Sequence, residues 1–227
     1  LTYDEILKVA RAAAGLGVSK MRLTGGEPLL DKHIAELIAG LAEIPGVDDL
    51  ALTTNAMLLA PVAQTLADAG LHRVTISLDS LDPEVFRHMS GGRGDLDKVL
   101  EGLHAAEAAG LDPVKINVVV QRGVNDHTVL DLLEHFRGTG HIVRLIEFMD
   151  VGNRNHWRFD QVVPSRQLLD QVRARWALRR MDQNYPGEVA HRYEDVDGQG
   201  EIGFISSVTE PFCGDCSRAR LSADGML

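Results

Sequence analysis

The sequence lacks any apolar run that could cross a membrane, and it has very few cysteines. A membrane-spanning helix needs roughly 18 consecutive apolar residues, and no stretch of the 227 residues approaches that length. The N-terminal residues LTYDEILKVA lack the basic and then apolar segments of a signal peptide. Cys213 and Cys216 are the whole cysteine content, too little for the disulfide framework of a secreted domain. These absences exclude an integral membrane protein and predict a cytoplasmic protein in a reducing compartment.

An excess of basic residues is also missing. The chain has 23 Lys and Arg against 33 Asp and Glu, a formal net charge of -10. This balance argues against general affinity for nucleic acid or for an anionic membrane, although it permits a local basic pocket for a phosphorylated small molecule. A hydrophobic content of 44% in 227 residues can build one barrel-sized domain, or one domain with an appendage.

Short β-type runs alternate with amphipathic helical patterns along most of the chain. Strands are expected near Met21, Leu50, Val74, Val114 and Ile142, and again near Ile202 and Ala219. Helices are expected over 4–16, 33–41, 61–69, 96–109, 128–136 and 167–175. Repeated βα units with short connections predict a parallel sheet, because parallel strands need crossover helices. We therefore predict an α/β fold, a partial parallel (β/α) TIM-like barrel over 1–150 with a β-containing extension over 151–227.

Polar, glycine-bearing segments follow the five main strands. They read TGGEP, TTNAM, SLDS, QRGVND and EFMDVG. In parallel α/β folds the carboxyl ends of the strands lie on one face, and that face carries the active site. Loops that face solvent are also polar, so part of this pattern is expected even without an active site.

The segment Thr24-Gly25-Gly26-Glu27-Pro28 has two glycines that let the backbone approach a ligand closely. A Gly-Gly pair alone would be only a turn. Lys115 and Asn117 share one face of an otherwise apolar strand, which favours polar groups pointing into a lumen over an edge strand.

The second chemical segment is the pair Cys213 and Cys216 with two arginines after it. A CxxC turn can hold one metal, and zinc, an iron–sulfur cluster, a dithiol and a structural pair all stay open. Arg218 and Arg220 would lie on one face of the strand expected near Ala219. Two forked cations suit a polyphosphate, and a solvated edge strand is the alternative.

The TGGEP segment resembles the GGEP motif of radical S-adenosylmethionine enzymes. Together with CxxCxRxR and the runs LALTTNAMLL, ISLDSLDPEVF, KINVVVQRGVND and RLIEFMDVG, it resembles the MoaA family of GTP 3′,8-cyclases nearly end to end. The resemblance implies conversion of GTP to (8S)-3′,8-cyclo-7,8-dihydroguanosine 5′-triphosphate in the first step of molybdenum cofactor biosynthesis. It also implies S-adenosylmethionine, two [4Fe-4S] clusters and transfer of the product to MoaC, and it allows a homodimer.

The resemblance assigns roles by motif but names no catalytic residue. S-adenosylmethionine would contact Gly26, Ser77 and Met149, and the auxiliary cluster would be bound by Cys213 and Cys216. GTP would be held by Arg22, Thr53, Lys115, Arg218, Ala219 and Arg220. Without the resemblance, Thr53 and Ser77 would be ordinary strand-end hydroxyls and Met149 a core residue.

The sequence departs from the family in four places. No CxxxCxxC loop, no third C-terminal cysteine and no small-residue C-terminal tail are present, and Ala56 stands where the family motif TTNG has glycine. We expect that the chain is truncated at both ends, with those cysteines upstream of Leu1 and beyond Leu227. Three other hypotheses stay open: a peptide-modifying radical enzyme with an auxiliary cluster, a non-catalytic nucleotide-binding α/β scaffold, and a zinc-stabilised barrel. His156 and His191 supply no clear zinc ligand set.

Overall fold

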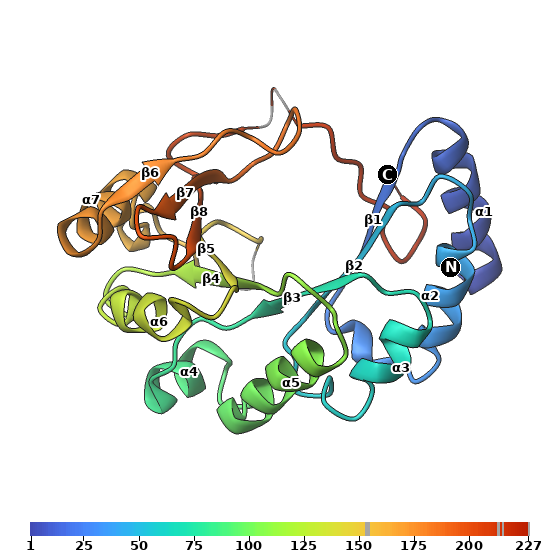
Figure 1. Cartoon of the computed structure of the whole chain (residues 1–227), viewed down its shortest axis with the longest axis horizontal. Coiled ribbons are helices and arrows are strands. Elements are labelled where there is room, and N and C mark those ends of the chain that lie inside the picture. Colours follow the sequence, from blue (N-terminus) through green and yellow to red (C-terminus); the bar gives the residue numbers. More distant parts are fainter. Residues whose placement is uncertain (153–154, 213, 215, 227) are drawn as a thin grey trace. The chain divides into compact units, whose positions relative to one another are not determined.

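The structure of the chain is a computed structural model that describes residues 1–152, 155–212, 214 and 216–226. Its elements are labelled in Figure 1. The chain divides into two compact units, which are described separately. The first contains residues 1–77, 97–114 and 219–227, and the second contains 78–96 and 115–218.

The first unit contains a three-stranded parallel sheet. Strands β1 (Lys20–Leu23), β2 (Asp49–Thr54) and β3 (Arg73–Ser77) pair in that order. The first unit also contains helices α1 (Tyr3–Gly15), α2 (Ile34–Ala42) and α3 (Ala63–Asp68), the 3-10 turn η1 (Pro28–Leu30), and all but the first residue of α5 (Leu96–Ala108). Leu50, Leu52, Val74 and Ile76 have no exposed surface, as expected of strands in a covered parallel sheet.

The second unit contains a mixed five-stranded sheet. Its order is β4 (Lys115–Val120), β5 (Ile142–Glu147), β8 (Glu201–Ile205), β7 (His191–Asp195) and β6 (Leu178–Arg180). β4, β5 and β8 are parallel to one another, β7 is antiparallel to β8, and β6 is antiparallel to β7. The helices are α4 (Pro83–Met89), α6 (Val129–Phe136) and α7 (Ser165–Arg175), with a 3-10 turn η2 (Phe159–Gln161).

The two faces of β4 and β5 differ in burial. Ile116, Val118 and Val120 are fully buried, whereas Lys115 and Asn117 are half-buried on the other face. Burial alternates in the same way along β5. The period of two residues thus separates an apolar core face from a partly polar face.

The predicted α/β class with mostly parallel strands is confirmed, and the five main strands and all predicted helices are present. The predicted strand near Ala219 is wrong, because residues 216–222 form no strand. Arg218, Ala219 and Arg220 are all exposed, so the segment has no apolar face for a sheet to bury. The C-terminal β structure is partly an extension of the sheet itself, because β8 pairs directly with β5. The division at residue 150 stays a prediction.

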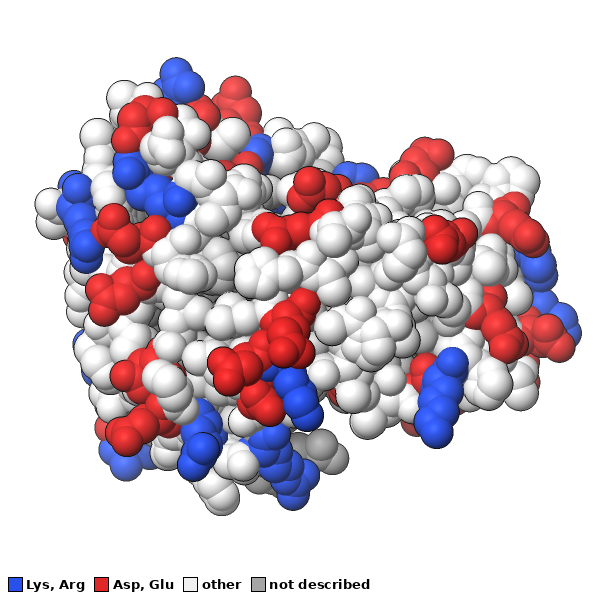
Figure 2. Space-filling view, turned by 60° about the horizontal axis from the view of Figure 1, so that its bottom comes forward, with Lys and Arg blue, Asp and Glu red and all other residues white. Residues whose placement is uncertain are grey.

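Within the described residues, the helix α4, the strands β6 and β7 and the two 3-10 turns η1 and η2 were not predicted. The start of α4 has a readable signal, since Asp82 caps the amides of Glu84 and Val85 and Pro83 occupies the first helical position. None of the helices in the described residues is long and apolar enough to cross a membrane. On the face shown in Figure 2, acidic and basic side chains are interspersed.

Candidate functional site

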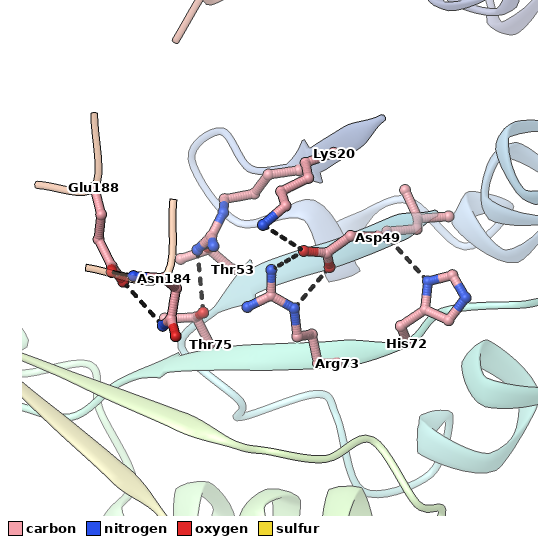
Figure 3. A network of polar contacts seen from close by, with 10 residues as sticks. Lys20, Asp49, Thr53, His72, Arg73, Thr75, Asn184 and Glu188 are labelled. Carbon is pink, nitrogen blue, oxygen red and sulfur yellow. Dashed lines mark hydrogen bonds and ion pairs between the residues drawn. The ribbon is translucent and has the colours of Figure 1, made fainter. Parts of the chain in front are cut away.

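Arg22 is held against the sheet of the first unit by two hydroxyl groups. Its Nη1 donates to Thr53 Oγ1 at 3.2 Å and to Thr75 Oγ1 at 3.1 Å. Thr53 and Thr75 are paired across β2 and β3, and Thr75 is 1% exposed. Figure 3 shows Thr53 and Thr75 on the same side of the sheet. The structure therefore brings together two residues predicted to bind GTP and adds Thr75, which the sequence reasoning missed although it lies two residues before Ser77.

A second polar group lies along the same strands. Asp49 accepts a hydrogen bond from Arg73 Nε at 2.7 Å and a second from Arg73 Nη2, and Lys20 Nζ lies 4.0 Å from its carboxylate (Figure 3). Arg73 and Asp49 are both mostly buried, at 18% and 19% side-chain exposure. This ion pair holds β2 against β3. Asp49 and Arg73 therefore have a structural role, unlike the ligand-binding role predicted for Arg22.

The loop after β1 is fixed by Glu27. Its Oε1 accepts from Thr54 Oγ1 at 2.7 Å and from the Leu29 amide at 3.0 Å, and its Oε2 accepts from the Asn55 amide at 2.8 Å. Both carboxylate oxygens of Glu27 thus already accept hydrogen bonds from the protein itself. At Gly26 an added Cβ would meet no atom within 4 Å, so the backbone there is open to a ligand.

The backbone conformation of Ala56 bears on its departure from the TTNG motif. It has a φ of 61° and no exposed surface. A left-handed backbone favours glycine, and alanine adopts it at a cost of about 1 kcal/mol. Ala56 thus has a backbone conformation that glycine adopts without this cost.

The half-buried face of β4 carries Lys115 and Asn117. The buried Oδ1 of Asn117 accepts no hydrogen bond from the described residues. Arg144 of β5 is the register partner of Asn117, and a Cβ at Gly203 would lie 3.2 Å from Arg144 Cγ. Glycine at 203 therefore lets the Arg144 stem lie across β8. The sequence reasoning missed Arg144, although an arginine inside the apolar run IVRLIEF was a readable signal.

The loops after β3 and β4 are joined by buried polar groups. Asn125, with no exposed surface, donates to the carbonyls of Asp79 and Val119 and accepts from the Gln121 amide. Asp79 accepts from the Val119 amide at 2.8 Å. Burial raises the pKa of Asp79 to about 6, although the hydrogen bond from Val119 opposes it. Ser77, predicted to contact S-adenosylmethionine, is exposed at the end of β3.

The C-terminal segment brings Cys216 and Arg218 together. Arg218 Nε lies 3.3 Å from Cys216 Sγ, and its guanidinium stands 5.3 Å from the centre of the Phe212 ring. Arg218 and Arg220 are exposed and do not share a strand face, so the structure does not support that reason for pairing them. Cys213 lies outside the described residues. Met149 is 42% exposed, and its carbonyl accepts from Asn155 Nδ2 at 2.9 Å.

The predicted residues divide between the two units. The first unit holds Arg22, Gly26, Thr53, Ser77, Ala219 and Arg220, and the second holds Lys115, Met149, Cys216 and Arg218.

The residues present fit part of an iron–sulfur site. Cysteine sulfur is the ligand that iron–sulfur clusters use, and Cys216 supplies one. Gly214 leaves open space, because an added Cβ there would meet nothing within 4 Å. Within the described residues, no group of three or more His, Cys, Asp and Glu side chains is arranged to hold a metal ion. Cys216 thus fits as one member of a larger ligand set.

Comparisons with known proteins match family models to most of the chain. The Radical SAM superfamily model matches residues 1–136, and the Molybdenum Cofactor Synthesis C model matches residues 141–227. A "GTP 3′,8-cyclase" of Xanthomonas campestris pv. campestris (strain B100) is 59% identical over 227 residues, which are 100% of this chain and 67% of that protein. One of Acidothermus cellulolyticus is 51% identical over 225 residues, 99% of this chain and 62% of that protein.

Solved structures share the fold at low sequence identity. Streptococcus suis SuiB bound to S-adenosylmethionine has a TM-score of 0.63 at 17% identity, over 76% of this chain and 40% of that one. Methylornithine synthase has a TM-score of 0.61 at 18% identity, over 76% and 52%. These similarities confirm the α/β fold of the radical SAM type.

Proposed function

This chain belongs to the radical SAM superfamily, and on that premise we propose that it is the core of a GTP 3′,8-cyclase. The reaction is conversion of GTP to (8S)-3′,8-cyclo-7,8-dihydroguanosine 5′-triphosphate in molybdenum cofactor biosynthesis. The observation that carries the proposal is the 59% identity to the Xanthomonas cyclase over the whole chain, together with the C-terminal family match. Streptococcus suis SuiB bound to S-adenosylmethionine shares the fold, but at only 17% identity.

The chain's cationic residues would bind and orient the triphosphate. Arg22 is already fixed by two threonine hydroxyls, so less side-chain freedom is lost when it binds an anion. Lys115 and Arg144 lie on one half-buried face of β4 and β5, where a charge–charge contact is screened less than at an exposed surface. Arg218, Ala219 and Arg220 would complete the GTP site.

The open backbone at Gly26, the Ser77 hydroxyl and Met149 would contact S-adenosylmethionine. When bound, S-adenosylmethionine and an iron–sulfur cluster supply the radical chemistry, and the protein contributes positioning and exclusion of water. Cys213 and Cys216 would be two ligands of the auxiliary cluster. Two four-iron clusters, transfer of the product to MoaC, a homodimer and a cytoplasmic setting are further parts of the proposal that follow from the family resemblance.

The test measures iron content and GTP affinity in the full-length protein reconstituted under anaerobic conditions. About eight irons per chain are expected if both sites are four-iron clusters. An iron-free protein that binds zinc would contradict the proposal, and an iron-free protein that binds GTP would favour the non-catalytic scaffold.

Variants locate the GTP site. Arg22→Ala and Lys115→Ala should each weaken GTP binding roughly tenfold or more, because each removes a charge-assisted contact, while the iron content stays unchanged. Lys8→Ala is the matched control, since Lys8 is exposed on α1. Unchanged GTP affinity in both test variants would remove these residues from the site.

A further inference from the structure

Glu147 is a fully buried carboxylate at the last position of β5. Its Oε1 accepts from the Ser165 amide at 2.8 Å and from Thr209 Oγ1 at 2.6 Å. Its Oε2 accepts from the Val208 amide at 2.9 Å and the Thr209 amide at 2.8 Å. One side chain thus satisfies donors from two distant segments, the start of α7 and the segment after β8.

The strand end that carries Glu147 and the segment after β8 both lead to predicted site residues. Met149 follows Glu147 by two positions, and its loop is fixed further, because Trp157 Nε1 donates to the Phe148 carbonyl at 2.9 Å. Thr209 precedes Phe212 in the same segment. The Phe212 ring lies against the Arg218 guanidinium, which lies beside Cys216. Glu147 is therefore a direct link between the strand end that carries Met149 and the segment that leads to Cys216.

The negative charge of Glu147 is what this link requires. Burial raises the pKa of Glu147, but the hydrogen bonds from Thr209, Ser165 and Val208 together hold it below its usual value. Four donors and no acceptor face the carboxylate, so glutamine would bring an NH₂ group against N–H groups. A buried charge that lost these donors would be strongly unfavourable.

We propose that Glu147 is a positioning residue that holds the segment leading to Cys216 against the end of β5, and so fixes the auxiliary-cluster segment relative to Met149. This inference rests on the proposed function. Glu147 would touch neither GTP nor S-adenosylmethionine and would act through residues 208 and 209. Its loss should therefore separate cleavage of S-adenosylmethionine from formation of product.

The first measurement needs no cofactor. In Glu147→Gln, hydrogen exchange of the Val208 and Thr209 amides should speed up roughly tenfold or more, because each amide loses its acceptor. Exchange in α1 of the same protein should not change. Unchanged exchange at 208 and 209 would overturn the proposal, whatever the fate of the cyclase assignment.

The second measurement uses the reconstituted full-length protein and compares product formed with S-adenosylmethionine cleaved. Glu147→Gln should lower that ratio roughly tenfold, and Glu147→Asp, which keeps the charge, should restore part of it. Thr209→Val keeps the amide but removes the hydroxyl donor, so it should lower the ratio less. If Glu147→Gln fails to fold, Thr209→Val and Glu147→Asp decide the question.

Val172→Ala controls for stability. Val172 is fully buried in α7 of the same unit, and its truncation should destabilise the unit without changing the donors of Glu147. If Val172→Ala lowers the ratio of product formed to S-adenosylmethionine cleaved as much as Glu147→Gln does, the ratio follows stability alone and the proposal is overturned. If the wild-type protein makes no cyclic product while exchange at 208 and 209 depends on Glu147 as expected, the proposed function fails and the contact itself stands.

Discussion

The charge of Asp79 should destabilise the folded protein at neutral pH. Its pKa rises from 3.8 to about 6 on folding, mainly through burial. The folded state therefore holds this proton more tightly than the unfolded state between these two pH values. The stability contributed by protonated Asp79 is complete below pH 3.8 and is lost as the pH rises through about 6.

The size of the effect follows from the pKa change. Raising the pKa from 3.8 to about 6 corresponds to about 3 kcal/mol lost at pH 7. Judged by its exposed surface area, Asp79 is only half-buried, so solvent screening makes the loss of stability smaller than this value. Asp79→Asn keeps an oxygen to accept the Val119 amide and removes the charge, and should raise the free energy of unfolding at pH 7 by about 1 to 3 kcal/mol.

The assay is urea unfolding followed by circular dichroism between pH 4 and pH 8, with wild type and variant compared at each pH. The stabilisation by Asp79→Asn should be large at pH 8 and close to zero at pH 4. Asp170→Asn, exposed on α7, is the control and should stay within about 0.5 kcal/mol of wild type. A gain of the same size at both pH values, or no gain at pH 8, would refute the role of the charge.

Other substitutions test the packing and hydrogen bonds that hold the loops. Gly102→Ala should lower the free energy of unfolding by about 3 kcal/mol, because its Cβ would lie 2.4 Å from the Ala56 carbonyl, whereas Gly15→Ala meets nothing within 4 Å and should not destabilise. Asn125→Ala should cost about 3 kcal/mol in urea unfolding, since three hydrogen bonds of a fully buried side chain are lost; wild-type stability would contradict the network. Thr2→Ala should cost about 1 kcal/mol by removing the cap of α1, and an unchanged unfolding midpoint would show that this cap contributes nothing.

The sequence by itself determined the local elements and the chemical motifs. The alternation of β-type runs with helical periods predicted the main strands because a hydrogen-bonded backbone has a fixed period, which apolar residues must follow to be buried. The spacing of Cys216 and Arg218 likewise placed a guanidinium near a thiol, because only one residue separates them. The same local reasoning failed at Ala219, where spacing matched a strand but no apolar face was present for a sheet to cover.

Only the tertiary structure decided which distant groups meet. Glu27 bonds Thr54 across 27 positions, Arg22 bonds Thr75 across 53, and Glu147 bonds Thr209 across 62. No sequence periodicity links such residues. The partners of a buried carboxylate or guanidinium are the donors and acceptors that the chain path brings within about 3 Å. The pairing of β8 with β5 has the same origin, because the chain path brings β8 back beside β5. For this protein, the sequence determined the types of residue available to the candidate site, and the fold determined which of them hold one another in place.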